Sequence, residues 1–293
     1  MVRRPLEPAR LALRRTLFRR QIRAVLAGRS QTLDLELGVR GFDPSEMLAE
    51  AVVRFEPQMA AIELLTSALG RSASTSKVID GLGLRDPLVK RQSARIAGLL
   101  RMEAAVPWIA PLLWSRDASV RASAAHALGT IGGVRSADAL VIAIQRLGPR
   151  SSLIIALARA APDLYIEAIL SARHPRAALQ AAAAAAGLRG RRTAIAPLIA
   201  QSGVGSTRFR AAGTRALGWI GSPTAVPALI AALEQRDWRV RMSAAKALAS
   251  IKSYSPGPEL HSCLADRNEK VRRAAGSALR RLSRLGNAPV LGS

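Results

Sequence analysis

Apolar residues recur along the chain at spacings of three and four, inside a much longer repeat. The run at 117–132, DASVRASAAHALGTIG, is matched closely at 206–221 and 237–252, and less closely at 86–101 and 268–283. Such spacings place the apolar side chains on one face of a helix. The pattern therefore predicts that one amphipathic helix is repeated along the chain.

Each run has one apolar residue near its start, which we call the anchor, and the spacing between anchors gives the length of the repeat. Consecutive anchors are equally spaced within two groups, Val89 and Val120, then Phe209, Val240 and Val271. A further copy at 174–189 has Ala177 as its anchor. The interval between Val120 and Ala177 is longer than one unit and too short for two full units. We therefore expect one shortened repeat there, with helices at 151–162 and 163–172.

A capping residue and a second apolar segment complete each unit. The second segments include 105–114 and 225–235, each with an early proline, where a missing N–H costs little. Two amphipathic helices in about 31 residues cannot bury their apolar stripes alone, so neighbouring units must stack. The pattern predicts an all-α solenoid of helical hairpins. The expected N-terminal caps, three positions before the anchors, are Asp86, Asp117, Ser206, Asp237 and Asn268.

The repeated run resembles the short bacterial HEAT repeat, also described as HEAT-like or phycobilin-lyase-like. That signature is Asp-x-x-Val-Arg-x-x-Ala-Ala-x-Ala-Leu-Gly-x-Ile-Gly, then Ala-Val-Pro-x-Leu-Ile, and residues 117–132 and 206–230 are similar to it. The resemblance covers about 76–285. It implies a right-handed superhelix of six to seven hairpins and the role of a scaffold or adaptor. We accordingly expect an N-terminal helical cap at 1–75, the solenoid at 76–285 and a short tail at 286–293.

Charge is distributed unevenly along the chain. There are 44 Lys and Arg against 20 Asp and Glu, a net charge of +24. Residues 1–29 hold nine arginines and one acid, whereas 30–63 hold seven acids and two arginines. A field of this size attracts anionic partners, although arginine is also common on solvated surfaces without function. The acidic segment is expected to dock on the basic solenoid, within the chain or between two chains.

Two rows of basic residues follow the anchors. In the family that the repeats resemble, the residue after each anchor is basic and is paired with an Asp five positions before an anchor; here only Asp266 holds that place. The first row therefore either faces a partner or binds loop carbonyls: Lys90, Arg121, Arg210, Arg241 and Arg272. The second row shares nearly one helical face and is expected to line a concave binding surface: Arg91, Arg95, His126, Arg215, Lys246 and Arg273.

The N-terminal residues 5–27 are predicted to form a basic amphipathic helix. Such a helix binds an anionic membrane surface or an acidic partner, or it caps the open end of the first repeat. Residues predicted to make the membrane or partner contact are Arg14, Arg15, Phe18, Arg19, Ile22 and Arg23.

Residues that carry catalysis or hold metals are sparse. His126, His174 and His261 lie far apart, and no His-Glu pair is present. This counts against a resemblance to the iron-dependent deoxyhypusine hydroxylases, which are HEAT proteins that need such pairs. The one cysteine, Cys263, has no disulfide partner and is expected to be a small buried residue in a reducing compartment. No cofactor, metal site or catalytic residue is predicted, and we expect a protein that is not an enzyme.

The sequence thus favours a scaffold that binds an acidic protein partner, with a contact to an anionic membrane surface as an addition. One alternative is nucleic-acid binding, as in the HEAT-like alkylpurine DNA glycosylases, whose groove carries a carboxylate flanked by aromatics. We expect Asp117 and Asp237 to be helix caps instead, with Trp238 exposed and Trp108 and Trp219 packed. A bilin-lyase-like chaperone is a further alternative.

The expected location is the cytoplasm, with a peripheral position at the inner face of the membrane as an addition. No sufficiently long apolar run predicts a membrane span. The arginine-rich N-terminal stretch lacks the apolar region of a signal peptide. An anchor preceding Met1 in a longer product stays an open alternative.

Overall fold

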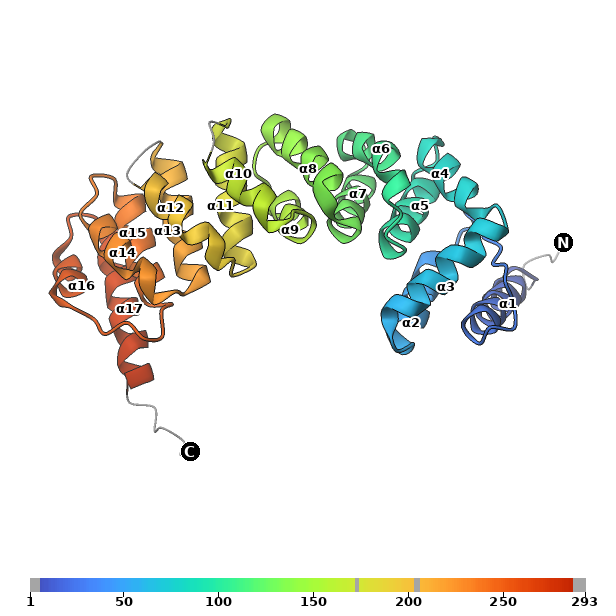
Figure 1. The fold of residues 1–293 in the computed structure, drawn as a ribbon, viewed down its shortest axis with the longest axis horizontal. Helices are drawn as coiled ribbons and strands as arrows, with labels where there is room; N and C mark the ends of the chain where they lie inside the picture. Colours follow the sequence, from blue (N-terminus) through green and yellow to red (C-terminus); the bar gives the residue numbers. More distant parts are fainter. Residues whose placement is uncertain (1–5, 172–173, 203–205, 287–293) are drawn as a thin grey trace. The chain divides into compact units, whose positions relative to one another are not determined.

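The computed structural model describes residues 6–171, 174–202 and 206–286, and every regular element in them is helical. This confirms the predicted all-α fold. The chain forms two compact units, residues 1–140 and 141–293 (Figure 1). The predicted tail at 286–293 lies outside the described residues from 287 onward, and the end of the predicted helix 163–172 does so at 172.

The N-terminal unit begins with three helices that precede the first hairpin. The second helices of its hairpins, α5 and α7, pack on each other, while α2 packs against α5 and α1 against α3. A 3-10 turn at Ala110–Trp114 extends the short helix α6. The elements are α1 (Leu6–Leu26), α2 (Pro44–Arg54), α3 (Gln58–Arg71), α4 (Ser74–Gly83), α5 (Pro87–Leu99), α6 (Val106–Ile109) and α7 (Ala118–Ile131).

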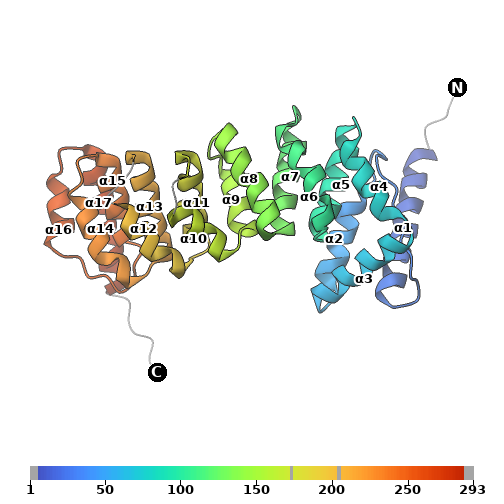
Figure 2. The ribbon, with the colours of Figure 1, turned by 45° about the horizontal axis from the view of Figure 1, so that its top comes forward.

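The C-terminal unit is a stack of helical hairpins, and the boundary between the two units lies within α8 (Gly133–Leu147). The odd-numbered helices α9 to α17 pack in succession, and α10, α12, α14 and α16 pack in succession beside them (Figure 2). In each unit we call the second helices of the hairpins the second-helix row of that unit; they are α5 and α7 in the N-terminal unit and the odd-numbered helices α9 to α17 in the C-terminal unit. The elements are α9 (Ser151–Ala160), α10 (Asp163–Ser171), α11 (Arg176–Leu188), α12 (Ile195–Ser202), α13 (Thr207–Ile220), α14 (Val226–Leu233), α15 (Trp238–Leu248), α16 (Pro258–Ser262) and α17 (Glu269–Gly286).

All five predicted caps are confirmed, and they explain where the second helices begin. The side chain of Asp117 accepts hydrogen bonds from the backbone N–H groups of Ser119 and Val120, at 2.7 and 3.2 Å. The Ser119 hydroxyl also donates to this carboxylate, and these bonds hold the pKa of Asp117 below its usual range. The equivalent acceptors are Asp86, Ser206, Asp237 and Asn268.

The position of one anchor was predicted wrongly by a single residue. Ala178 is buried, whereas Ala177 is only half-buried. With Ala178 as the anchor, Gly187 follows it at the same distance along the chain as Gly218 follows Phe209. The interval from Ala178 to Phe209 then equals the interval from Phe209 to Val240, as in the other copies.

The irregular middle of the chain also differs from the prediction of one shortened repeat. Helix α9 packs against α11 and helix α10 against α12, so the two helices belong to different rows. The buried residues Ala124, Leu153 and Ala182 occupy equivalent positions, and the two intervals between them are equal. Each interval is slightly shorter than the regular one. Two slightly shortened units therefore fill the region, because α9 lacks its first turn.

Candidate protein-binding surface

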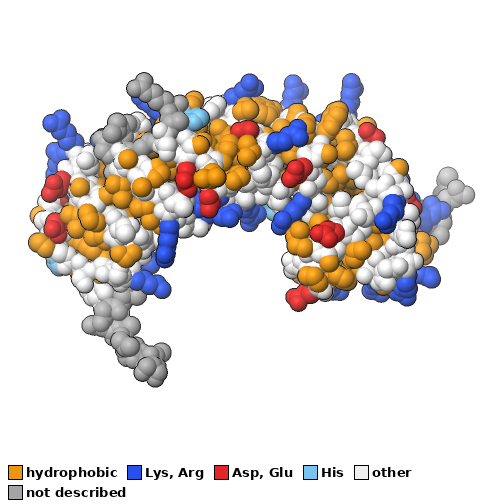
Figure 3. Space-filling view, in the orientation of Figure 1, with side chains coloured by type: hydrophobic (Ala, Val, Ile, Leu, Met, Phe, Trp, Pro, Cys, Tyr) orange, Lys and Arg blue, Asp and Glu red, His pale blue; other side chains and the backbone are white. Residues whose placement is uncertain are grey.

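The second-helix row of the C-terminal unit presents exposed cations at equivalent positions on packed neighbours. Arg215 on α13 and Lys246 on α15 are both exposed, and their helices pack side by side. Packed helices lie about 10 Å apart, which sets the separation of the two side chains. Trp219 lies one turn beyond Arg215 and is 51% exposed. We call these three residues, with Arg273 on α17, the basic face; Figure 3 shows Lys and Arg side chains beside α17.

The cations of the basic face are only partly neutralised. Within the described residues, the side chains of Arg215 and Lys246 have no ion-pair or hydrogen-bond partner. Arg273 pairs with Glu269 one turn earlier on the same helix. The middle of the basic face is therefore a pair of uncompensated cations beside an exposed indole ring.

In the N-terminal unit an acidic segment covers the same row. Arg95 on α5 lies 3.0 Å from the Asp43 carboxylate and 3.6 Å from that of Glu46. One turn earlier, the Gln92 amide donates to the Phe42 carbonyl at 2.9 Å and accepts from the Gly38 N–H at 2.8 Å. The expected docking of the acidic segment on the basic repeats is confirmed within the chain.

His126, the next member of the row, also lies beside the acidic helix α2. It lines a hollow of about 190 Å³ with Ser45, Glu46 and Arg95, and it is not without a partner. The row is thus occupied in the N-terminal unit.

The first basic row has a structural role in most repeats. Arg121 donates to the carbonyls of Ser115 and Arg116, both at 2.8 Å. Arg241 does the same for Gln235 and Arg236, and Arg272 for Asp266. The expectation that these arginines bind loop carbonyls is confirmed for all three.

Contacts between successive repeats extend this role. Buried Arg241 binds Asp266 through two hydrogen bonds, at 2.7 and 2.9 Å. Arg210 donates to the amide oxygen of Gln235 at 3.0 Å. In this pair of repeats a glutamine therefore takes the place of the acid. Lys90 and Arg91 are half-buried, and the Arg91 Nε is buried without a partner among the described residues.

Sequence reasoning did not single out Arg191, which clamps the irregular middle repeat. Its guanidinium is buried, donates to the carbonyls of Ala158 and Ala161 and lies 2.7 Å from the Asp163 carboxylate. Burial lowers the pKa of Arg191, and the charge of Asp163 opposes that shift. Arg189 also donates to the Ala158 carbonyl. Arg189 and Arg191 thus supply hydrogen-bond donors to the carbonyls at the C-terminal end of α9.

The predicted exposure of the tryptophans was wrong. Trp108 and Trp219 are 54% and 51% exposed, whereas Trp238 is half-buried. The guanidinium of Arg239 and the ammonium of Lys270 lie 4.7 and 4.8 Å from the Trp238 ring centroid. Trp219 is exposed because the α13 position one turn after Arg215 faces away from the core, and its ring edge rests on Gly187.

The apolar face of α1 packs inside the N-terminal unit. Phe18 and Ile22 are buried, and the Phe18 ring meets the Phe42 ring edge-on at 5.7 Å. Arg14 and Arg19 pair with the acidic segment at Glu36 and Glu50, Arg15 donates to the Gly41 carbonyl, and Arg23 is exposed. Helix α1 thus packs on α2 and α3, and its apolar face is covered within the unit. In the part of the chain that the structure describes, no helix is long and apolar enough to cross a membrane.

Potential metal ligands are not clustered in the described ranges. No group of three or more His, Cys, Asp or Glu side chains is placed there to hold a metal ion. Cys263 is buried, as predicted, and burial raises the pKa of its thiol.

Comparison with known families agrees with this architecture. The family described as HEAT repeats matches residues 75–158, 162–249 and 226–291. The chain belongs to that family, whose solenoids are generally scaffolds for protein interactions. No curated protein matches the chain.

Several solved structures are similar to the chain at low identity. Human deoxyhypusine hydroxylase in complex with glycerol is 19% identical, over 93% of this chain and 99% of that one, with a TM-score of 0.37. A designed armadillo repeat protein is 18% identical over 70% and 98%, with a TM-score of 0.32. An engineered protein is 19% identical over 82% and 78%, with a TM-score of 0.34.

Proposed function

We propose that the protein is a non-catalytic HEAT-repeat scaffold whose basic face binds an acidic segment of a protein partner. The observation that carries the proposal is the docking of the chain's own acidic helix on the equivalent row. In the N-terminal unit, Asp43 and Glu46 neutralise Arg95. In the C-terminal unit, Arg215 and Lys246 occupy the equivalent positions without a neutralising group among the described residues.

The surroundings of these cations favour a protein over a nucleic acid as the partner. Trp219 offers apolar area next to Arg215, and aromatic residues with arginine are typical of the energetically dominant part of protein interfaces. Single-strand binding instead needs several aromatic platforms among the cations. Asp117 and Asp237, the carboxylates that a glycosylase-like groove would need, cap helices. Nucleic-acid binding is therefore the second candidate.

The proposal also covers the location of the protein and a contact with a membrane. A reducing, cytoplasmic location is supported by the single buried cysteine. Membrane contact through α1 is an addition to the proposal. It would involve the arginines of that helix, because its apolar face is already packed. A bacterial, bilin-lyase-like character rests on the repeat signature alone.

Reversing the charges of the basic face should weaken binding of an acidic helix by tenfold or more. The probe is a labelled peptide of residues 42–56, which contains α2 and carries four acids and one arginine. We expect Arg215→Glu/Lys246→Glu to lose binding because two attractions become repulsions. The measurement is fluorescence anisotropy with the full chain at about 0.15 M salt.

A matched variant separates this site from general electrostatics. Arg236→Glu/Lys252→Glu makes the same change in net charge at exposed positions in the loops that flank α15. It should leave peptide affinity within about twofold, because screened charges at a distance contribute little. Equal losses in both variants would refute the proposed face. Tighter binding of duplex DNA, lost in the same face variant, would make nucleic acid the ligand.

A further inference from the structure

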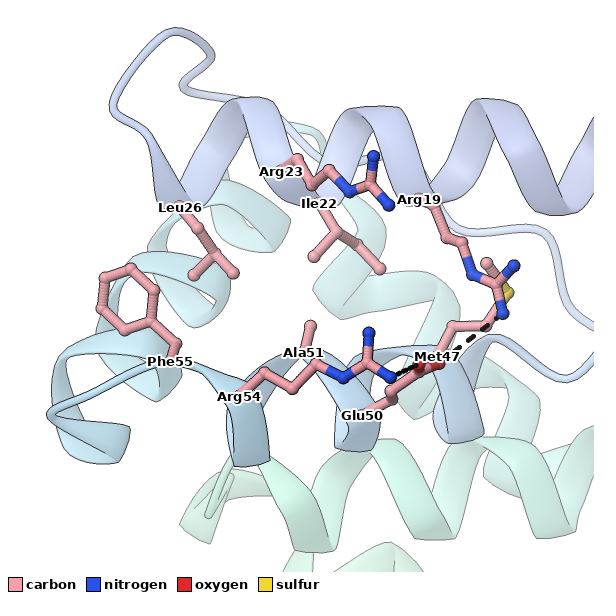
Figure 4. A pocket seen from close by; sticks show the side chains of 9 residues that line it. All are labelled: Arg19, Ile22, Arg23, Leu26, Met47, Glu50, Ala51, Arg54 and Phe55. Atoms are coloured by element: carbon pink, nitrogen blue, oxygen red, sulfur yellow. Dashed lines mark ion pairs between the residues drawn. The ribbon is translucent and has the colours of Figure 1, made fainter.

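A hollow between α1 and α2 in the N-terminal unit is separate from the basic face. It has a volume of about 230 Å³ (Figure 4). Ile22 and Ala51 face each other in its middle, and Leu26 and Phe55 lie at one end. Arg19 and Glu50 lie at the other end. The hollow therefore has an apolar interior and a charged rim.

The hollow exists because the facing stripes of two helices do not fill the space between them. Its lining residues follow helical spacing on both helices: Arg19, Ile22, Arg23 and Leu26 on α1, then Met47, Glu50, Ala51 and Arg54 on α2. The small side chain of Ala51 lies opposite Ile22, where a larger residue would close the gap. The helices are held at this distance by the core beneath, in which Ile22 and Met47 are buried.

The rim carries an excess of positive charge. Glu50 lies 2.8 Å from the Arg54 guanidinium and 3.6 Å from that of Arg19, so one carboxylate serves two arginines. Arg23 also lines the hollow and has no partner among the described residues. With three arginines and one glutamate, the rim has positive charge that a ligand's carboxylate can neutralise. Hydrogen bonds between arginine and a carboxylate are among the stronger ones in proteins.

We propose that this hollow binds one large apolar side chain, of leucine or phenylalanine size, from a protein segment whose neighbouring residues are Asp or Glu. Its volume is below the roughly 300–1,000 Å³ typical of small-molecule sites and suits a single side chain. Apolar anchors that fill such pockets commonly dominate protein interfaces. The flanking carboxylates would pair with Arg23 and Arg54. This site is independent of the basic face and does not rest on it.

The test compares two labelled, terminally blocked peptides, Glu-Glu-Phe-Glu-Glu and Glu-Glu-Ala-Glu-Glu, binding to the full chain. The phenylalanine peptide should bind about tenfold more tightly, because only its ring enters the hollow. Equal affinity of the two peptides overturns the proposal without any change to the protein.

Variants of α2 locate the site. Ala51→Phe fills the hollow and should abolish the preference for the phenylalanine peptide. Val53→Phe places the same ring at an exposed position on the same helix, outside the hollow, and should preserve the preference. Helical circular dichroism checks that both variants fold, and Ala51→Leu is a second, smaller filling. A preference unchanged by both fillings overturns the proposal.

Further controls test whether the peptide binds at the hollow or at the basic face, and whether the ligand is a lipid. Arg23→Glu should weaken the phenylalanine peptide severalfold. If Arg215→Glu/Lys246→Glu removes the binding instead, the peptide sits on the basic face and only the hollow is refuted. If vesicles of anionic lipid bind in an Ala51→Phe-sensitive manner while the peptide does not, the ligand is a lipid and the proposal is wrong.

Discussion

Replacing Asp266 with alanine is expected to lower the free energy of unfolding by about 3 kcal/mol or more. The side chains of Arg241 and Asp266 are 8% and 9% exposed, and the guanidinium binds the carboxylate through two nitrogens. Removing the carboxylate leaves a buried charge with only carbonyl partners, and uncompensated buried charge is costly. Urea denaturation followed by helical circular dichroism measures the loss.

The neighbouring exposed ion pair provides the control. Glu269→Ala removes the carboxylate of the Glu269–Arg273 pair, whose side chains are 60% and 75% exposed. Solvent screens such pairs, so the expected cost is about 0–1 kcal/mol. If the two substitutions cost the same, burial does not set the strength of the Arg241–Asp266 contact.

The same contact predicts the pH dependence of stability. The hydrogen bond from Arg241 holds the pKa of Asp266 below its ordinary value of 3.8. A carboxyl with a lower pKa in the folded chain binds its proton more readily when unfolded. Its contribution is therefore complete above the unfolded pKa and is lost as the pH falls through the lowered folded pKa. Asp266→Ala should remove this part of the acid-side loss, whereas Glu269→Ala should retain it.

Features that depend on a few neighbouring residues were predictable from the sequence. A cap is satisfied within three positions of itself, so a polar residue before each anchor located the starts of α5, α7, α13, α15 and α17. The docking of the acidic segment was also predictable in kind, because charges were segregated along the chain. Of the residues that hold the segment, Arg95 was among those predicted and Gln92 was not. Gln92 carries no charge, and its amide binds the backbone of residues 38 and 42.

Features that depend on contacts between repeats were harder to predict. In the alanine run at 181–186 the side chains are alike, so the pattern could not show whether position 177 or 178 is the anchor. The Arg241–Asp266 and Arg210–Gln235 contacts each join positions 25 apart in the chain. The repeat pattern marked Asp266 as the acid that pairs with this basic row, but it did not show that the partner is Arg241 of the preceding repeat. At position 235 the pattern showed only that the expected acid is missing, and not that Gln235 takes its place. Trp219 looked like a core residue because the residues before and after it are apolar.

Replacing Gly218 with alanine is expected to destabilise the chain by about 2 kcal/mol. Helix α13 has this glycine near its end, and a Cβ there would lie 2.6 Å from both the Cα and the Cβ of Ala247 on α15. Backbone cannot yield as a flexible side chain can, so the two helices must move apart. Gly98 faces Ala127 and Gly187 faces Ala216 in the same way. The glycine-to-alanine contact is thus a recurring device that sets the spacing of the second-helix row.

Gly70→Ala makes the same substitution in α3, where an added Cβ would have nothing within 4 Å. Alanine is favoured over glycine inside a helix by about 1 kcal/mol, so this variant should be slightly more stable than the original chain. The two substitutions then have opposite signs in urea denaturation, although both add one methyl group to a helix. If Gly218→Ala is also stabilising, helix propensity outweighs the close approach of α13 and α15. In that case the recurring glycines do not set the separation of the repeats.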